Sequence, residues 1–187
     1  MSKNLGHRLG EVDETAEENT LERFRDNVRF ESLESWSYTE FDIVESKDGQ
    51  LFVFHDRDFR KYGWTARVQD TYAAVIAERY PHIPSYNELV EELLKHDLKK
   101  PIRVEIKNLV SEAGILKLVK HTARLRDKFA DVQFIAFRAH FKRSFPKKTR
   151  DNFKQLFTSW NFKVLNVKNH KEDLFNPGKL GGFLNWF

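Results

Sequence analysis

Short extended runs alternate with amphipathic helical segments along this chain of 187 residues. Strands separated by helices pair in parallel, because the chain crosses over the sheet before it returns in the same direction. The pattern therefore predicts an α/β fold. The expected strands are 38–45, 51–55, 102–107, 132–137 and 162–167, with a weaker candidate at 3–7. The expected helices begin at Asn19 and Ser85, the latter ending near Lys95, and cover 115–125 and 149–159.

The run 102–107 places apolar side chains at alternate positions, with Arg103, Glu105 and Lys107 between them. In a parallel barrel, one set of alternate residues faces the helices and the other faces the interior, and reactive groups collect where the strands end. A complete eight-unit barrel usually needs about 250 residues, with a lower range near 200. We therefore expect residues 1–187 to form a single domain with a TIM-barrel-like (β/α) fold, shortened or incomplete at its C-terminal side.

The charges are divided unevenly between the two halves of the chain. Residues 1–100 contain 14 Lys and Arg against 21 Asp and Glu, a net charge of −7; residues 101–187 contain 18 against 7, a net charge of +11. A basic half can bind a polyanion, but it also suits a solvated surface or a site for a small anionic substrate. We favour the second interpretation and expect no nucleic-acid partner.

Several classes of protein are excluded or disfavoured by composition. The absence of cysteine excludes disulfides, thiolate metal ligands and a cysteine nucleophile. Residues 1–8 lack the apolar core of a signal peptide, and no run approaches the length of a membrane span, so we expect a cytoplasmic protein. The apolar segment 183–187 is expected to dock against the sheet; the alternative is contact with a second copy in a homodimer.

Five acid/base residues lie at or beside predicted strand ends. Two of them, Glu40 and Asp42, are two positions apart on one strand, so their carboxylates point to the same face. Parallel carboxylates repel each other unless a cation or proton lies between them, and hard divalent metals prefer such oxygen ligands. Histidine is the side chain best suited to proton transfer near neutral pH. The set, which predicts a metal-assisted hydrolase of phosphate esters, is His7, Glu40, Asp42, His55 and Glu105.

A series of short motifs resembles the glycerophosphodiester phosphodiesterase family. Each is weak alone, but all occur in the family's order, and the resemblance covers about residues 5–107. The motifs are Gly6-His7-Arg8, Glu18-Asn19-Thr20-Leu21, Glu40-Phe41-Asp42, Lys47-Asp48-Gly49, Phe54-His55-Asp56, Ile83-Pro84-Ser85 and Glu105-Ile106-Lys107. One departure is that Leu9 follows His7-Arg8 where the family has glycine.

The resemblance implies a TIM barrel that uses a divalent cation, Mg²⁺ or Ca²⁺, to hydrolyse glycerophosphodiesters to glycerol 3-phosphate and an alcohol. It also implies a role for each residue of the candidate site. Glu40, Asp42 and Glu105 would bind the metal, His7 and His55 would be the acid/base pair, and Arg8 and Lys107 would hold the phosphate oxygens. Glu18 and Asn19 are expected to cap a helix rather than to take part in catalysis.

Two other functions are compatible with the sequence. Related barrels support a phospholipase D-like activity on lysophospholipids or sphingomyelin with the same histidines and acidic residues. The third possibility is a catalytically silent module whose basic half binds an anionic polymer or membrane, for which 141–148, with its interleaved aromatic and basic residues, is the best support.

Overall fold

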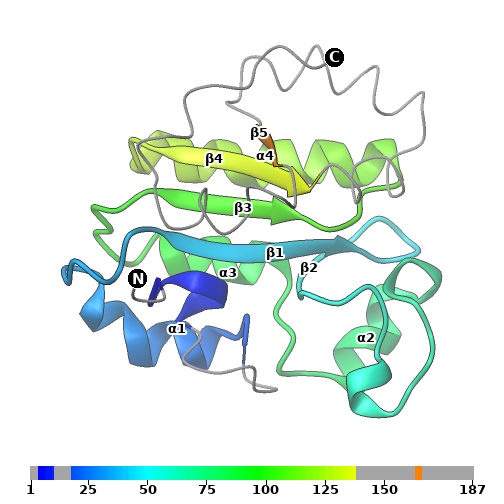
Figure 1. Cartoon of the computed structure of the whole chain (residues 1–187). Helices are drawn as coiled ribbons and strands as arrows, with labels where there is room; N and C mark the ends of the chain where they lie inside the picture. Colours follow the sequence, from blue (N-terminus) through cyan, green and yellow to red (C-terminus); the bar gives the residue numbers. More distant parts are fainter. Residues whose placement is uncertain (1–3, 11–17, 138–162, 166–187) are drawn as a thin grey trace.

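The structure is a computed structural model that describes residues 4–10, 18–137 and 163–165 (Figure 1). Its strands are β1 Thr39–Glu45, β2 Leu51–Val53, β3 Ile102–Ile106, β4 Val132–Phe137 and β5 Lys163–Leu165. Its α-helices are α1 Leu21–Asn27, α2 Ala73–Arg79, α3 Tyr86–Leu93 and α4 Glu112–Lys128. The 3-10 turns are η1 His7–Leu9, η2 Val28–Phe30, η3 Arg60–Tyr62 and η4 Val68–Asp70.

The strands form one five-stranded sheet in the order β2-β1-β3-β4-β5. Neighbouring strands from β1 to β5 pair in parallel, whereas β2 returns antiparallel to β1 after the turn around Gly49. Asp42 on β1 lies opposite Glu105 on β3 in this register. The arrangement confirms the predicted α/β fold with a partial, barrel-like sheet.

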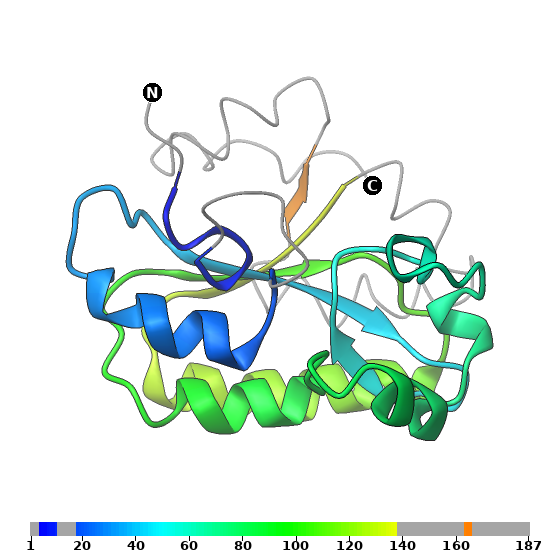
Figure 2. The same ribbon diagram turned by 90° about the horizontal axis from the view of Figure 1, so that it is seen from below.

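Helices α3 and α4 lie together on one side of the sheet (Figure 2). The side chains that face them from β1 and β3, including Phe41 and Val104, are fully buried in one apolar core with residues of α1. The predicted start of α3 is confirmed: Ser85 Oγ accepts a hydrogen bond from Glu88 N, and Glu88 Oε2 accepts one from Ser85 N at 2.7 Å. This reciprocal cap satisfies two backbone donors that the first turn leaves unpaired.

The segment between β2 and α3 contains η3, η4 and α2, although the charged, Gly-containing stretch 56–70 predicts a loop over the strand ends. Phe59 is fully buried in a second apolar cluster, where its ring stacks on Tyr80 with centroids 4.7 Å apart. Helix α2 was not predicted, because it buries only Ile76 and its N-cap, Tyr72, makes no side-chain cap. Burial of aromatic surface therefore anchors this segment.

The N-terminal strand prediction is wrong where the structure describes it. Residues 4–10 form a turn followed by η1, and Asn4 Nδ2 donates to Tyr38 O at 3.0 Å instead of joining a backbone ladder. Gly6 is required there, because a Cβ on it would lie 2.0 Å from Tyr38 O. Leu9 adopts a φ of 63°, the left-handed conformation that glycine favours, and is fully buried.

The remaining strand predictions agree with the structure within two residues; of the predicted strand 162–167, the structure describes residues 163–165, which form β5. The predicted helix 149–159, the basic segment 141–148 and the apolar segment 183–187 lie outside the described residues. Within the described ranges, none of the helices combines the length and apolar character needed to cross a membrane.

Candidate active site

Three carboxylates meet on the face of the sheet opposite the helical core. Glu40 and Asp42 project from β1 and Glu105 from β3, and one oxygen of each lies within 4.8 Å of the others. All three side chains are buried. Their convergence follows from the i, i+2 spacing on β1 and from the register that sets Asp42 beside Glu105.

Burial and mutual repulsion disturb the protonation of this cluster. Burial raises the pKa of Glu40 well above its usual range, and the charges of Asp42 and Glu105 raise it further. Burial likewise raises the pKa of Glu105, against the opposing effect of Lys107. For Asp42, burial is outweighed by the positive charges around it, of which Lys107 is the largest, so its pKa falls below the usual range.

Lys107 supplies part of the positive charge that the cluster needs. Its Nζ lies 3.0 Å from Asp42 Oδ1 and donates a hydrogen bond to Glu105 Oε1. Burial alone would lower the pKa of Lys107, but Asp42 and Glu105 raise it above its usual value. When all three carboxylates are ionised, as ligation of a cation would require, three negative charges against one ammonium give this group a formal charge of −2.

The donor set fits a divalent cation. Glu40 Oε1 is buried, and none of the described residues donates a hydrogen bond to it. A buried carboxylate oxygen without a donor is costly unless a cation or proton compensates it. Carboxylate oxygens are the ligands that Mg²⁺ and Ca²⁺ prefer, and two positive charges would balance the formal charge of the cluster. Glu40, Asp42 and Glu105 could therefore hold such an ion.

His7 lies beside this cluster in η1. Its Nε2 is 3.6 Å from Glu40 Oε2, and the same oxygen accepts a hydrogen bond from Arg8 N at 2.9 Å. Gly6 N–H and C=O tie the turn to Asn4 and to Glu40 N, respectively. The close approach permitted by Gly6 thus sets the histidine against the three clustered carboxylates.

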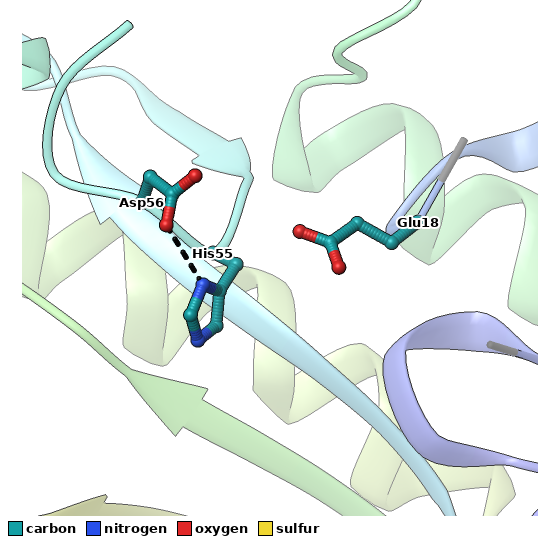
Figure 3. Close-up of side chains that lie close together, drawn as sticks. All are labelled: Glu18, His55 and Asp56. Carbon is teal, nitrogen blue, oxygen red and sulfur yellow. Dashed lines mark hydrogen bonds and ion pairs between the residues drawn. The ribbon is translucent and has the colours of Figure 1, made fainter. Parts of the chain in front are cut away.

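His55 follows β2, and a positive charge on its ring would oppose, more weakly than Lys107, the effect of burial on the pKa of Asp42 and Glu105. Its Nδ1 lies 2.9 Å from Asp56 Oδ1 (Figure 3). The pKa of the Asp56 carboxyl is held below its usual value, first by this hydrogen bond. An ionised carboxylate only accepts, so Nδ1 carries the hydrogen and Nε2 is left to exchange protons.

Arg8 and Lys107, the expected phosphate-binding residues, both lie at the carboxylate cluster. Arg8 Nε is 3.7 Å from Asp42 Oδ2, and its guanidinium donates to Glu18 Oε2 at 2.6 Å. Six of the seven predicted site residues therefore meet at the carboxylate cluster of β1 and β3, and the seventh, His55, follows β2.

The expectation that Glu18 and Asn19 cap helix α1 is wrong. Thr20 is the N-cap, and its side chain accepts a hydrogen bond from Arg23 N. Asn19 has a φ of 61°, incompatible with the extended backbone of a cap, and its Nδ2 donates to Asp42 Oδ2 at 2.9 Å. The match of Glu18-Asn19-Thr20 to the family motif was the signal that could have placed both residues in the site.

A second group of potential ligands lies next to the first. Glu18, His55 and Asp56 each offer an atom within 4.8 Å of the others, and Figure 3 shows Glu18 projecting toward the other two. Lys61 Nζ lies between the two carboxylates, 3.1 Å from Glu18 Oε1 and 3.8 Å from Asp56 Oδ2. No motif or spacing in the sequence predicts the position of Lys61.

Comparison with known proteins identifies the fold. No family model matches the chain, and no curated protein matches its sequence. Solved structures do: a glycerophosphodiester phosphodiesterase from Agrobacterium tumefaciens superposes with a TM-score of 0.57 at 20% identity over 87% of this chain and 66% of that one. A Galdieria sulphuraria protein, described as a candidate for the same activity, gives 0.62 at 20% identity over 91% and 66%.

A third structure is an Oleispira antarctica phosphodiesterase in complex with the product sn-glycerol-3-phosphate, with a TM-score of 0.51 at 16% identity over 92% of this chain and 88% of that one. The chain has the fold of the glycerophosphodiester phosphodiesterases. It spans 66% of the length of the Agrobacterium and Galdieria structures. This partial coverage agrees with the five-stranded, incomplete barrel of the described residues.

Proposed function

We propose that this protein hydrolyses glycerophosphodiesters to glycerol 3-phosphate and an alcohol in a reaction that depends on a divalent cation. The observation that carries the proposal is the convergence of Glu40, Asp42 and Glu105 on a buried, net negative site beside His7. The shared fold supports the same reaction class. The complex of the Oleispira enzyme with sn-glycerol-3-phosphate supports a glycerol phosphate substrate.

Glu40, Asp42 and Glu105 would hold the cation. When bound, a divalent cation would neutralise charge on the phosphodiester and orient its oxygens. Asn19 holds Asp42 through two hydrogen bonds: its Nδ2 donates to the carboxylate oxygen Oδ2 at 2.9 Å, and its Oδ1 accepts from the backbone N–H of Asp42 at 3.3 Å. The chain thereby holds its ligands in place before a substrate arrives, which reduces the ordering required during the reaction.

The two histidines would divide the proton transfers. Hydrolysis of a phosphodiester requires one group to take a proton from the attacking hydroxyl and another to protonate the leaving oxygen. His7 and His55 belong to separate segments, at the start of the described chain and after β2, so each can serve a different oxygen. Arg8 and Lys107 would add positive charge near the phosphate oxygens.

An assay with glycerophosphocholine tests the proposal. We expect release of glycerol 3-phosphate with Mg²⁺ or Ca²⁺, no release with EDTA, and a loss of at least about a hundredfold in His7→Ala and His55→Ala. His96→Ala is the matched control, because His96 packs against Phe24 in the helical layer. Absence of release from any glycerophosphodiester, or release of choline alone from lysophospholipids or sphingomyelin, would contradict the proposal.

A further inference from the structure

A chain of ionic contacts joins the two histidine-bearing segments. Arg8, next to His7, donates to Glu18 Oε2 at 2.6 Å, and the other oxygen of Glu18 accepts from Lys61 Nζ at 3.1 Å. Lys61 Nζ lies 3.8 Å from Asp56 Oδ2, and the other oxygen of Asp56 meets His55 Nδ1 at 2.9 Å. Charges of opposite sign therefore alternate along the whole connection.

The middle of this chain is shielded from water. The Glu18 side chain is 6% exposed and that of Lys61 is 24% exposed. The ammonium of Lys61 also lies 4.6 Å from the centre of the Phe54 ring and 5.3 Å from that of Tyr62. Low exposure strengthens the attraction between Lys61 and Glu18, and the aromatic faces attract the ammonium separately; the Asp56 side chain, 38% exposed, lies closer to water.

Lys61 also explains the second group of potential metal ligands. Its ammonium lies between Glu18 and Asp56, where a metal ion shared by them would have to bind. It supplies a positive charge without an added ion, whereas the pair Glu40 and Asp42 has a buried oxygen that receives no hydrogen bond from the described residues. The two acidic groups therefore differ. The ammonium of Lys61 supplies the positive charge at Glu18 and Asp56, whereas the other group leaves a buried oxygen open to an added ion.

We propose that Lys61 is a positioning residue: by bridging Glu18 and Asp56, it fixes the loop of His55 relative to the segment of His7 and holds the His55 ring in the tautomer that carries its hydrogen on Nδ1. The catalytic consequence rests on the proposed function. Lys61 touches neither histidine ring in its described contacts and acts through Asp56. It extends from η3, so the aromatic cluster that anchors this segment also sets the position of the bridge.

The direct test is the tautomer of His55, observed by ¹⁵N NMR of its imidazole in metal-free, substrate-free protein under conditions where the ring is neutral. We expect a single Nδ1–H form in the wild type and a mixture of the two tautomers in Lys61→Met. Glu18→Gln should produce the same change, although Glu18 does not hydrogen-bond to the ring. Lys61→Arg, which retains the charge, should restore the single form in part.

Kinetics supply the second measurement. Lys61→Met should lower kcat about tenfold with little change in KM, because a displaced acid/base group slows the chemical step more than substrate binding. The double variant Glu18→Gln/Lys61→Met should lose little more than either single variant, because all three break one connection. Lys99→Met, which removes the exposed ion pair of Lys99 and Asp97 at 2.7 Å, is the control that should behave as wild type.

The outcomes separate this inference from the proposed function. A wild-type protein without hydrolytic activity would overturn the proposed function, while the NMR experiment would still test the bridge. A single Nδ1–H tautomer that persists in both Lys61→Met and Glu18→Gln would overturn the bridge. If Lys61→Met does not fold, Glu18→Gln carries the same test, since it preserves the size of the side chain it replaces.

Discussion

The two faces of β1 and β3 differ in what they bury. One face presents Phe41 and Val104 to the helices and forms a conventional apolar core. The other presents Asp42 and Glu105, which are buried to a similar extent but are charged. Burial of apolar surface stabilises the fold, whereas burial of carboxylates costs free energy unless positive charge compensates them.

This difference assigns separate tasks to adjacent residues of one strand. The helix-facing side chains stabilise the fold. This stability allows the opposite face to hold like charges close together. Lys107 compensates only part of the charge there. An incompletely compensated cluster of this kind suits the cation site proposed above better than it suits a structural ion pair.

We expect the largest effect from a substitution on the charged face of β1, which should reduce catalytic activity. Asp42→Asn keeps the size of the side chain but removes a proposed metal ligand and the carboxylate that Asn19 Nδ2 contacts, so kcat/KM should fall about a thousandfold. Circular dichroism should show that the fold is retained. Asp97→Asn, at an exposed position, is the control. If Asp42→Asn keeps more than about a tenth of the activity, the two faces do not divide their tasks in this way.

The neighbouring residue on the apolar face should show the reverse. Phe41→Ala removes a fully buried ring that packs against Tyr86 and should lower the free energy of unfolding by about 3 kcal/mol. Urea denaturation measures this change, with the half-exposed Phe30→Ala as control. The kcat of the folded variant should stay close to that of the wild type. A large loss of kcat without loss of stability would break the comparison.

Substitution of Leu9 measures the balance between backbone strain and side-chain burial in the turn that carries His7. Its left-handed backbone costs roughly 1–2 kcal/mol, while burial of its side chain contributes roughly 2–3 kcal/mol plus the cavity avoided. Burial wins, so Leu9→Gly should lower the free energy of unfolding by about 2 kcal/mol despite relieving strain. Thermal denaturation measures the sign; a more stable variant would show that strain dominates this turn.

The elements that could be predicted from the sequence are those specified by local signals; those specified by tertiary contacts could not be predicted. Strand β3 and the cap of α3 could be predicted because alternation and the Ser85–Glu88 pair are local signals. Helix α2 could not, since it lacks a capping side chain and is anchored by contacts formed only in the fold. The prediction that Asn19 caps a helix was wrong, because its local preference for capping is overridden by a hydrogen bond to Asp42, 23 positions away in sequence.

The candidate site was predictable where a motif linked its residues and unpredictable where only the fold does. Glu40 and Asp42 share a strand, so their common direction follows from spacing alone. Lys61 reaches Glu18 across 43 positions, through a segment whose path depends on burial of Phe59. No spacing rule predicts the contact between Lys61 and Glu18.

The smallest expected effect comes from charges within the helical layer. Arg25, followed by Lys95 and His96, lowers the pKa of Glu92 to about 2 from its ordinary 4.5. A depressed pKa stabilises the fold above pH 4.5, and this contribution is lost as pH falls toward 2. Because Arg25 and Lys95 are exposed, we expect only about 1 kcal/mol.

Urea denaturation between pH 7 and pH 2 checks this expectation. Glu92→Gln should be less stable than the wild type near neutral pH, and the difference should vanish at the acid end of the range. The exposed Glu78→Gln variant should show no such window. A constant difference at every pH would mean that packing, not charge, accounts for the role of Glu92.

The most direct measurement is anomalous X-ray diffraction from crystals soaked in Mn²⁺, a divalent cation that binds oxygen ligands as Mg²⁺ does. We predict one strong peak within coordinating distance of Glu40, Asp42 and Glu105, absent in Asp42→Asn crystals, and none between Glu18 and Asp56, where Lys61 lies. A peak at the second group instead of the first, or no bound ion at either, would contradict the assignment of the charged face as a metal-dependent active site.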